Sequence, residues 1–343
     1  MLILISSLFL FSFGVFNLLG IKPSLVPTEL IAVAVGLGLA VVIRAIGIHF
    51  FRLNAVFFYW VFVFLLIVTY IIGIEAKGSQ RWIDLYFFNF QASEFFKPFY
   101  ILFLADLLSK SRNQFHQRKT YLLAFFHFII PTCIIFKQPD LGNALVYGYI
   151  FVVMVFFSQI HKKYILVSLF CLMLVIPFAW SHMHGYQKDR ISSFFSPATE
   201  SRTTAYNMTQ AIITIGSGNV MGRGMGLGTQ SHLYFLPENH TDFAFSSLVE
   251  QFGFIGGVGV LILFAFLFYA LVRRILVYAA RSDVDGTFLY LFTIGILSFF
   301  MIQAFVNMGM NMGILPIAGI ALPFISYGGS MVLTIMIALT FVL

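Results

Sequence analysis

Long apolar stretches alternate with short polar segments along the chain of 343 residues. A helix rises about 1.5 Å per residue, so roughly 20 mainly apolar residues cross a hydrocarbon core about 30 Å thick. Ten stretches approach or exceed this length, at residues 2–19, 28–46, 54–74, 94–109, 121–136, 143–159, 164–180, 243–272, 287–306 and 322–343. The pattern predicts an all-α polytopic membrane protein with about ten transmembrane helices.

One long polar segment, residues 181–241, separates the seventh apolar stretch from the eighth. We expect an extracytoplasmic loop with short helices of its own, inside a single integral membrane domain over residues 1–343. The first stretch has no basic residues ahead of it and no small-residue cleavage site after it, so we interpret it as a retained helix. Composition agrees: 60% of residues are hydrophobic and only 10% are charged, too few to cover a soluble globule.

The distribution of charge predicts the orientation of the helices. With a cytoplasmic amino terminus, the inner loops collect 11 of the 20 basic residues, whereas short outer loops and outer helix ends hold five. Basic residues favour the cytoplasmic side, so the amino terminus is predicted to lie inside. Topology also explains the basic run at 110–119, and no nucleic-acid partner is expected. Ten of the 13 acidic residues fall on the outer side, which predicts that the chemistry faces outward.

Four ionisable residues stand on the outer side of the early helices. Glu94 and Lys97 are three positions apart, so they share one helix face and can pair. This spacing suits a structural ion pair and a lysine that contacts a lipid phosphate equally well. Asp140 follows Pro139 in a tight turn, where capping of the next helix is the simplest role. Arg81 lies on the same side, in a segment that mixes aromatic and charged residues.

Asp242 ends the long loop at the point where the eighth apolar stretch begins. A carboxylate at this boundary can meet a substrate that has a polar head and an apolar tail, but it can also simply stabilise the start of a helix. Glu238 lies four positions earlier. Glu250 lies two turns deeper on about the same face, and an ionisable group inside a span usually has a partner or a task.

The loop also contains six glycines between residues 216 and 228, which allow sharp turns and close approach of the backbone to a ligand. No strand precedes them and no Gly-Lys-Ser/Thr step occurs, so a nucleotide-binding loop does not fit. Arg190 and Arg223 frame the run and can hold phosphate oxygens or be merely solvated. The loop histidines lack a zinc-binding spacing, and Cys133 and Cys171 fall inside predicted helices, where no disulfide is expected.

Six blocks occur in an order typical of one family: GSQRWI at 78–83, QASEFFK at 91–97, QPDLG at 138–142, YQKDR at 186–190, LPENHTDF at 236–243 and LPFISYGGS at 322–330. Together they resemble the SEDS family of bacterial cell-wall polymerases. Residues 138–141, and 228–231 followed by 235–238, are closer to its elongation branch, RodA, than to its division branch, FtsW. The chain departs from the family pattern at Ala92, Pro98, Asn143 and Gln251, whereas Asp242 is unaffected.

The resemblance implies a ten-helix peptidoglycan glycosyltransferase in the bacterial cytoplasmic (inner) membrane. Its substrate would be lipid II, a disaccharide-pentapeptide on undecaprenyl diphosphate, and the family's catalytic acid falls on Asp242. The implied partners are a class B penicillin-binding protein, which is a transpeptidase, and the elongation machinery.

The expected mechanism uses Asp242 as a general base that takes the proton of the attacking sugar hydroxyl. Lys97, with Arg190 or Arg223, is expected to hold the departing diphosphate, and nearby acids to organise these cations. A divalent cation, Mg²⁺ or Mn²⁺, can share that task. The expected substrate-binding residues are Arg81, Glu94, Lys97, Asp140, Arg190, Arg223, Glu238 and Glu250.

Two other classes of function remain open from the sequence. Ten helices with intramembrane Glu250, Gln303 and Asn307 can form a flippase for a lipid-linked oligosaccharide, but transporters place such groups near the bilayer midplane, and here most lie at the outer boundary. A scaffold that only recruits a penicillin-binding protein is the other class, since small residues near the carboxyl terminus allow close helix packing.

Overall fold

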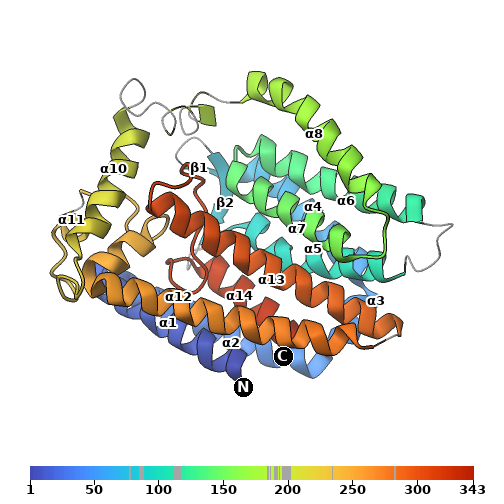
Figure 1. The fold of residues 1–343 in the computed structure, drawn as a ribbon, viewed down its shortest axis with the longest axis horizontal. Coiled ribbons are helices and arrows are strands. Elements are labelled where there is room, and N and C mark those ends of the chain that lie inside the picture. Colours follow the sequence, from blue (N-terminus) through green and yellow to red (C-terminus); the bar gives the residue numbers. More distant parts are fainter. Residues whose placement is uncertain are drawn as a thin grey trace. The chain divides into compact units, whose positions relative to one another are not determined.

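The computed structural model describes residues 1–343 except 77–78, 85–88, 111–116, 184, 186, 189–191, 193, 195–201, 234 and 282. A helix occupies each of the ten predicted spans (Figure 1). These helices are α1 (Leu2–Ile21), α2 (Val26–Ile46), α4 (Ala55–Ile72), α5 (Ala92–Ser109), α6 (Gln117–Lys137), α7 (Leu141–Phe157), α8 (Lys163–His182), α12 (Ala244–Ala279), α13 (Val284–Asn311) and α14 (Gly329–Val342). Six helical segments in the described chain are long and apolar enough to cross a membrane, and α7 and α14 are shorter apolar helices. The all-α polytopic prediction is confirmed.

Shorter elements connect the long helices. They are η1 (Pro23–Leu25), α3 (Ile48–Leu53), α10 (Arg202–Ser217) and α11 (Thr229–His232), together with the strands β1 (Ile74–Ala76), β2 (Ser79–Asp84) and β3 (Asn89–Phe90). Helices α10 and α11 confirm the expectation that the long loop carries helices of its own. The antiparallel sheet, in the order β1-β2-β3, was not predicted. Its strands are too short to show a clear alternation of apolar and polar residues.

The last predicted span begins later than its apolar pattern indicates. Residues 322–328 form turns, and α14 starts only at Gly329. The hydroxyl of Ser326 accepts a hydrogen bond from the amide of Leu322 at 2.8 Å, which stabilises this turn. Pro323 lacks an amide donor, so it also opposes a helix here.

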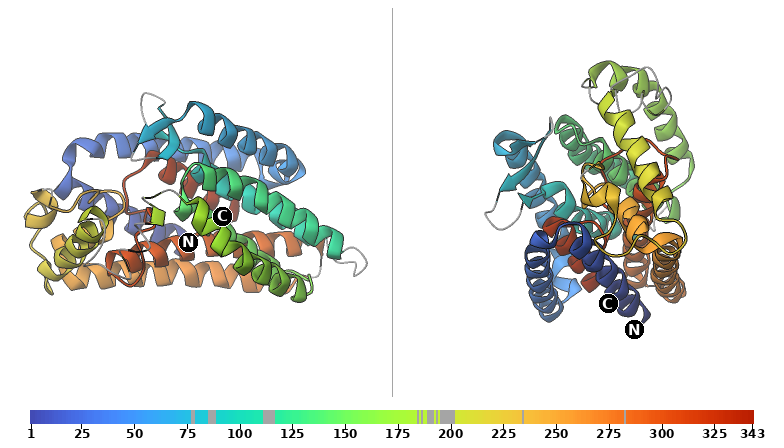
Figure 2. Two further views of the ribbon diagram at one scale, coloured as in Figure 1. Left: turned by 90° about the horizontal axis from the view of Figure 1, so that it is seen from above. Right: turned by 90° about the vertical axis from the view of Figure 1, so that its left-hand side faces the viewer.

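The chain divides into two compact units. Unit 1 comprises Met1–Gly36, Gly185–Ala270 and Met301–Ile335, and unit 2 comprises Leu37–His184, Leu271–Phe300 and Met336–Leu343. Within unit 2, α5 contacts α4, α6 and α7, and these four helices lie side by side in Figures 1 and 2. Aromatic rings fill the α4–α5 contact: the centroid of Phe99 lies 4.6 Å from that of Phe62, and Phe103 lies 4.6 Å from Tyr59.

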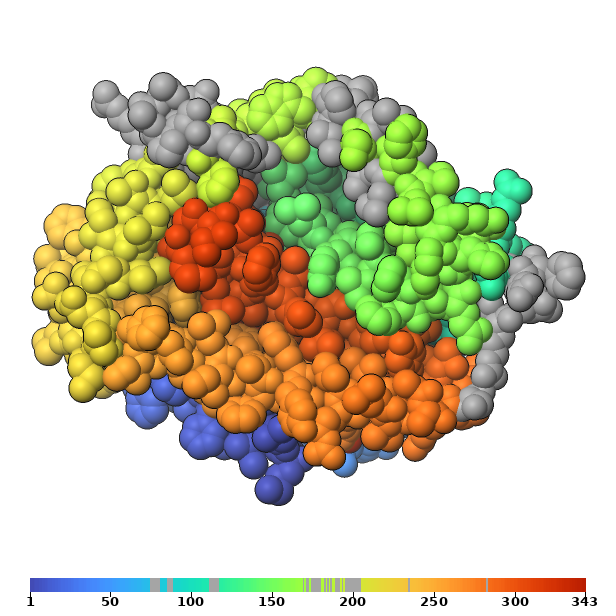
Figure 3. All heavy atoms as spheres, viewed as in Figure 1, coloured from blue at the N-terminus to red at the C-terminus, as the bar shows by residue number. Residues whose placement is uncertain are grey.

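The core of unit 1 joins the long loop to α13 and to the segment that follows it. Ala211 of α10 packs with Leu236, Phe243, Met310 and Ile317, all of them buried. Figure 3 shows α10 (yellow) beside the red surface that follows α13. The helix of the long loop therefore packs directly onto the elements that surround Asp242 in the sequence and the fold.

Candidate active site

Asp242 lies in a run of turns immediately before α12, as its position in the sequence predicts. It is partly exposed, whereas the following residue, Phe243, is buried. Each carbonyl of residues 239–242 accepts a hydrogen bond from a residue at least eight positions further along unit 1. The fold therefore fixes the backbone that carries the Asp242 carboxylate.

Two asparagines on α13 hold the Asp242 peptide. The Nδ2 atoms of Asn307 and Asn311 donate to the Asp242 carbonyl at 2.9 and 3.0 Å. Asn307 also donates to the carbonyl of Ile320 at 2.7 Å. The asparagines are four positions apart, so they lie on one helix face, and both are fully buried. Water does not compete for these bonds, which makes the attachment of the Asp242 backbone rigid.

The segment that precedes α14 holds the two residues before Asp242. The hydroxyl of Ser326 donates to the carbonyl of Thr241 at 2.6 Å, and the amide of Tyr327 donates to the carbonyl of His240 at 2.8 Å. Residues 322–330 attracted attention in the sequence only as a family block. In the structure this block has a physical task, which is to support the turn that ends at Asp242.

Glu238 shapes the same turn. Its carboxylate accepts a hydrogen bond from the Thr241 hydroxyl at 2.8 Å, and its carbonyl accepts from the amide of Phe243 at 3.0 Å. Its φ of 54° is unusual for a residue with a side chain and marks a sharp change of chain direction. Glu238 is therefore brought close to Asp242 in space as well as in sequence.

Glu250 is fully buried in α12, and its carboxylate binds the loop. It accepts hydrogen bonds from the amides of Gln230 and Ser231 at 2.8 and 2.9 Å, and also from the hydroxyls of Ser231 and Ser217. Substrate binding was the role expected for Glu250 from the sequence. In the structure its oxygens are occupied by protein donors away from the surface, so Glu250 anchors the loop to α12.

The two loop arginines that were expected to bind diphosphate have different outcomes. Arg223 is exposed, and its Nε donates to the carbonyl of Ser217 at 2.8 Å. Arg190 lies outside the described residues. No ion pair to a carboxylate is seen for Arg223 in the described part of the chain.

Unit 2 brings together the other four predicted residues. The Nζ of Lys97 lies 2.6 Å from Oε1 of Glu94, and both side chains are buried. Arg81 Nη1 lies 3.5 Å from Oδ1 of Asp140. Lys97 also lies 5.4 Å from the centroid of the Phe299 ring. The predicted Glu94–Lys97 pairing is confirmed, and buried charges of this kind are stable only because they are paired.

Asp140 caps α7 and also joins this cluster. Its Oδ1 accepts from the amide of Asn143 at 3.1 Å, which is the predicted capping bond. Its Oδ2 accepts from the side-chain amides of Asn143 and Gln91 at 2.9 and 3.1 Å. Asn143 further contacts the hydroxyl of Ser93 at 3.4 Å, so the start of α7 is tied to the start of α5.

Several polar atoms of this cluster have no hydrogen-bond partner among the described residues. They are Oε2 of Glu94, Nε of Arg81, Oδ1 of Asn143 and the hydroxyl of Tyr100. A buried polar atom without a partner costs about 1–3 kcal/mol. These atoms therefore favour a bound polar group or ordered water beside the Glu94–Lys97 pair.

The described residues contain no group of three or more His, Cys, Asp or Glu side chains that could hold a metal ion. Glu94 and Asp140, two of the acids that were expected to organise the diphosphate-binding cations, are engaged with Lys97 and Arg81.

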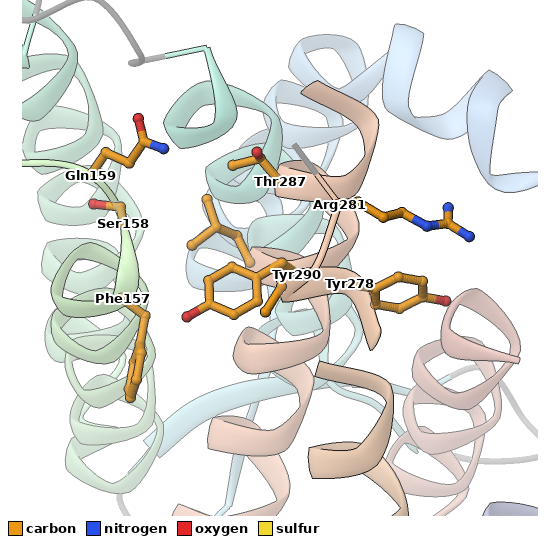
Figure 4. A pocket seen from close by; sticks show the side chains of 9 residues that line it. Phe157, Ser158, Gln159, Tyr278, Arg281, Thr287 and Tyr290 are labelled. Atoms are coloured by element: carbon orange, nitrogen blue, oxygen red, sulfur yellow. The ribbon is translucent and has the colours of Figure 1, made fainter. Parts of the chain in front are cut away.

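A pocket of about 360 Å³ lies elsewhere in unit 2, where α7 ends and α13 begins. None of the predicted site residues lines it. Figure 4 shows that the side chains of Arg281 and Tyr278 point away from Ser158 and Gln159. Arg281, the one cation among the described residues that line the pocket, is thus directed away from the polar groups on the opposite wall.

The sequence did not single out the residues that hold Asp242 in place. Asn307 was noted only as an intramembrane polar residue, and neither Asn311 nor Ser326 received a role of its own. Their bonds to residues 241 and 242 connect positions 65 to 85 apart. The one available signal was the spacing of two asparagines by a single turn inside an apolar helix, where a polar side chain needs a partner.

Comparison with known proteins shows a family match and similar relatives for this chain. It matches the FtsW/RodA/SpoVE family, described as cell cycle protein, over residues 1–343. It is 35% identical over 305 residues to the peptidoglycan glycosyltransferase MrdB of Escherichia coli strain K12, which is 89% of this chain and 80% of that protein.

Solved structures agree with this match. A chain from a peptidoglycan synthase complex, described by its structural coordination of polymerization and crosslinking, superposes with a TM-score of 0.82 at 27% identity, over 99% of this chain and 95% of that one. The rod shape determining protein RodA of Thermus thermophilus gives a TM-score of 0.71 at 25% identity, over 99% and 94%. The resemblance to SEDS proteins is confirmed, and the chain belongs to the FtsW/RodA/SpoVE family.

Proposed function

We propose that this protein is a peptidoglycan glycosyltransferase that polymerises lipid II, with Asp242 as the general base. The family membership and the relatives named peptidoglycan glycosyltransferase support the activity. The observation that carries the assignment of Asp242 is the attachment of its backbone. This partly exposed residue follows three residues whose carbonyls, like its own, accept hydrogen bonds from distant parts of unit 1.

The reaction joins two lipid-linked sugars. A hydroxyl of one sugar attacks the anomeric carbon of the other, and the bond from that carbon to the lipid diphosphate breaks, with its electron pair leaving on the diphosphate. The Asp242 carboxylate takes the proton of the attacking hydroxyl. A base held by buried hydrogen bonds needs no rearrangement when it takes the proton, which lowers the barrier.

Cations are needed for the departing diphosphate. We assign this task to Lys97 with Arg223 or Arg190, and we assign Arg81 to substrate binding with them. The acids Glu94, Asp140 and Glu238 organise the site. The observed Glu94–Lys97 and Arg81–Asp140 ion pairs support this division of roles, and a bound divalent cation, Mg²⁺ or Mn²⁺, would share the task of these cations.

The membrane location and the partner that we propose for the protein follow from its helices and its relatives. The chain is a multi-pass membrane protein, and the excess of basic residues in the predicted inner loops supports the bacterial cytoplasmic membrane with Asp242 facing outward. The similar chain from a peptidoglycan synthase complex supports a class B penicillin-binding protein as partner, within the elongation machinery.

The direct test replaces Asp242 by Asn and follows the glycan strands formed from purified lipid II. Asn keeps the size and shape of Asp but cannot take the proton, so we expect polymerisation to fall at least about 100-fold. Asp283→Asn, at an exposed residue beside α13, is the matched control and should retain activity. Undiminished polymer from Asp242→Asn would remove this residue from the mechanism. Parallel assays with and without the transpeptidase test the partner.

A further inference from the structure

The backbone of α12 is broken at Gly253, whose φ of 72° and ψ of −172° do not belong to a helix. A break leaves amides and carbonyls without their helical partners, and such groups are tolerated in a membrane helix only where other groups satisfy them. Residues 217–228, here called the glycine-rich segment, supply those groups.

Four backbone hydrogen bonds join the glycine-rich segment to the break. The amides of Arg223 and Gly224 donate to the carbonyls of Glu250 and Gln251 at 2.9 and 3.0 Å. In return, the amides of Phe254 and Ile255 donate to carbonyls of the segment at 2.8 and 3.2 Å. The segment thus lies along α12 and replaces the missing turn of hydrogen bonds.

Close approach of the two backbones explains the glycines. A Cβ atom on Gly222 would lie 2.2 Å from the carbonyl oxygen of Gln251, and one on Gly253 would lie 2.3 Å from the amide of Gly222. Both glycines also have positive φ, which side chains disfavour. The sequence suggested that the glycines approach a ligand, but at these two positions they approach α12.

The segment lies level with the last turn of α1, an apolar helix long enough to cross a membrane. The side chain of Gln251 accepts from the amide of Gly226 at 3.0 Å and donates to Asn17 of α1 at 2.7 Å. Gly226 also lies close to Gly20, since a Cβ atom on Gly20 would lie 2.8 Å from the Gly226 amide. The segment is therefore beside the end of a membrane helix and not out in the aqueous loop.

Large apolar side chains of the segment are turned outward at this level. The exposed fractions are 60% for Val220, 78% for Met221, 53% for Met225 and 70% for Leu227. Arg223 among them is exposed, and long arginines at a membrane surface direct the charge toward the headgroups. Four exposed apolar side chains around one arginine are typical of a segment that lies in the membrane interface.

We propose that the glycine-rich segment is an interfacial element whose Val220, Met221, Met225 and Leu227 side chains enter the acyl-chain region of the lipid leaflet at the end of α1. Continuity with the lipid-facing surface of α1 selects lipid as the occupant, because the segment touches that helix directly. A water-facing loop would expose these apolar side chains at a cost of roughly 25 cal/mol for each Å² of apolar surface.

The test measures the depth of spin labels in the full-length protein. Cys133 and Cys171 are replaced by Ala, and single cysteines are introduced at Met221 or Leu227. The protein is reconstituted alone into vesicles of phosphatidylethanolamine and phosphatidylglycerol. Leu8, an exposed residue of α1, provides the lipid-facing control, and His232, exposed in α11, provides the aqueous control.

We expect labels at Met221 and Leu227 to resemble Leu8, with a ratio of oxygen to water-soluble nickel collisions several-fold higher than at His232. Labels as accessible to nickel as His232 would overturn the proposal and indicate a surface that a protein partner covers. If a labelled protein does not fold, Met225→Trp gives a second measurement: brominated acyl chains should quench the added fluorescence, and absence of quenching would also overturn the proposal. Neither readout requires catalysis.

Discussion

Replacing Asn307 by Leu tests whether the α13 amides hold the base in place. Leu has the branched shape of Asn but donates no hydrogen bond. The carbonyl of Ile320 would lose its partner at 2.7 Å, and the Asp242 carbonyl would keep only the bond from Asn311. A buried carbonyl without a partner costs about 1–3 kcal/mol, so we expect N307L to lower the free energy of unfolding by that amount.

The same substitution should lower the rate of polymerisation. Asp242 would lose one of its two α13 attachments, and a displacement of about 1 Å at a reacting group can lower a rate about 100-fold. The effect should appear mainly in kcat, because Asn307 is fully buried and does not reach the surface where substrate binds.

Gln303→Met is the matched control. Gln303 lies one turn earlier on α13 and is equally buried, but neither polar atom of its amide has a hydrogen-bond partner in the part of the chain that the structure describes. Removing such an amide should leave stability unchanged or raise it. Thermal unfolding of both variants in detergent, together with polymer formation from lipid II, makes the comparison. Equal stability of N307L and Q303M would refute the reasoning, since the hydrogen bonds are what distinguishes the two sites.

Three further substitutions test other parts of the structure. E250Q places the hydrogens of its side-chain amide against groups that donate to Glu250 in the native protein. Thermal unfolding should therefore show a free energy of unfolding lower by about 1.5–3 kcal/mol. Unchanged stability would mean that these bonds do not hold the loop. G253A should lower the free energy of unfolding by more than about 1 kcal/mol, because Gly253 has a positive φ and close backbone neighbours. G216A, at an open position in α10, should raise it by about 0.4–1 kcal/mol. Equal effects of the two substitutions would contradict the account of the break at Gly253. K97M alone should lower the free energy of unfolding by about 3–5 kcal/mol, because it leaves Glu94 buried and unpaired. Adding E94Q to K97M should restore most of this stability. Additive losses of stability in this double-mutant cycle would argue against a coupled pair.

Local sequence patterns were sufficient for the helices and for part of the site. Each predicted span contains a helix because the apolar stretches are long. The capping bond that was predicted from the turn at Pro139 and Asp140 is present at the start of α7. The spacing of Glu94 and Lys97 on one face likewise predicted their pairing. In these cases the interacting residues are at most one turn apart, so the sequence alone fixes their geometry.

Contacts between distant segments could not be predicted in this way. Glu250 faces the loop because Gln230 and Ser231 pack against it, and no periodicity in the sequence reports such a contact. Asn143, a departure from the family pattern, proved to bind Asp140 through both its backbone and its side chain. A single changed residue therefore indicated the right place, but its partners became evident only from the fold.

The pairing of the glycine-rich segment with α12 also constrains how this family can diverge. Since backbone atoms on both sides of Gly253 are matched one by one to residues 219–224, an inserted or deleted residue there would shift every pair at once. Insertions and deletions among homologues should accordingly avoid residues 217–228. This stretch of constant length can therefore serve as a reference for aligning remote family members whose other loop residues differ.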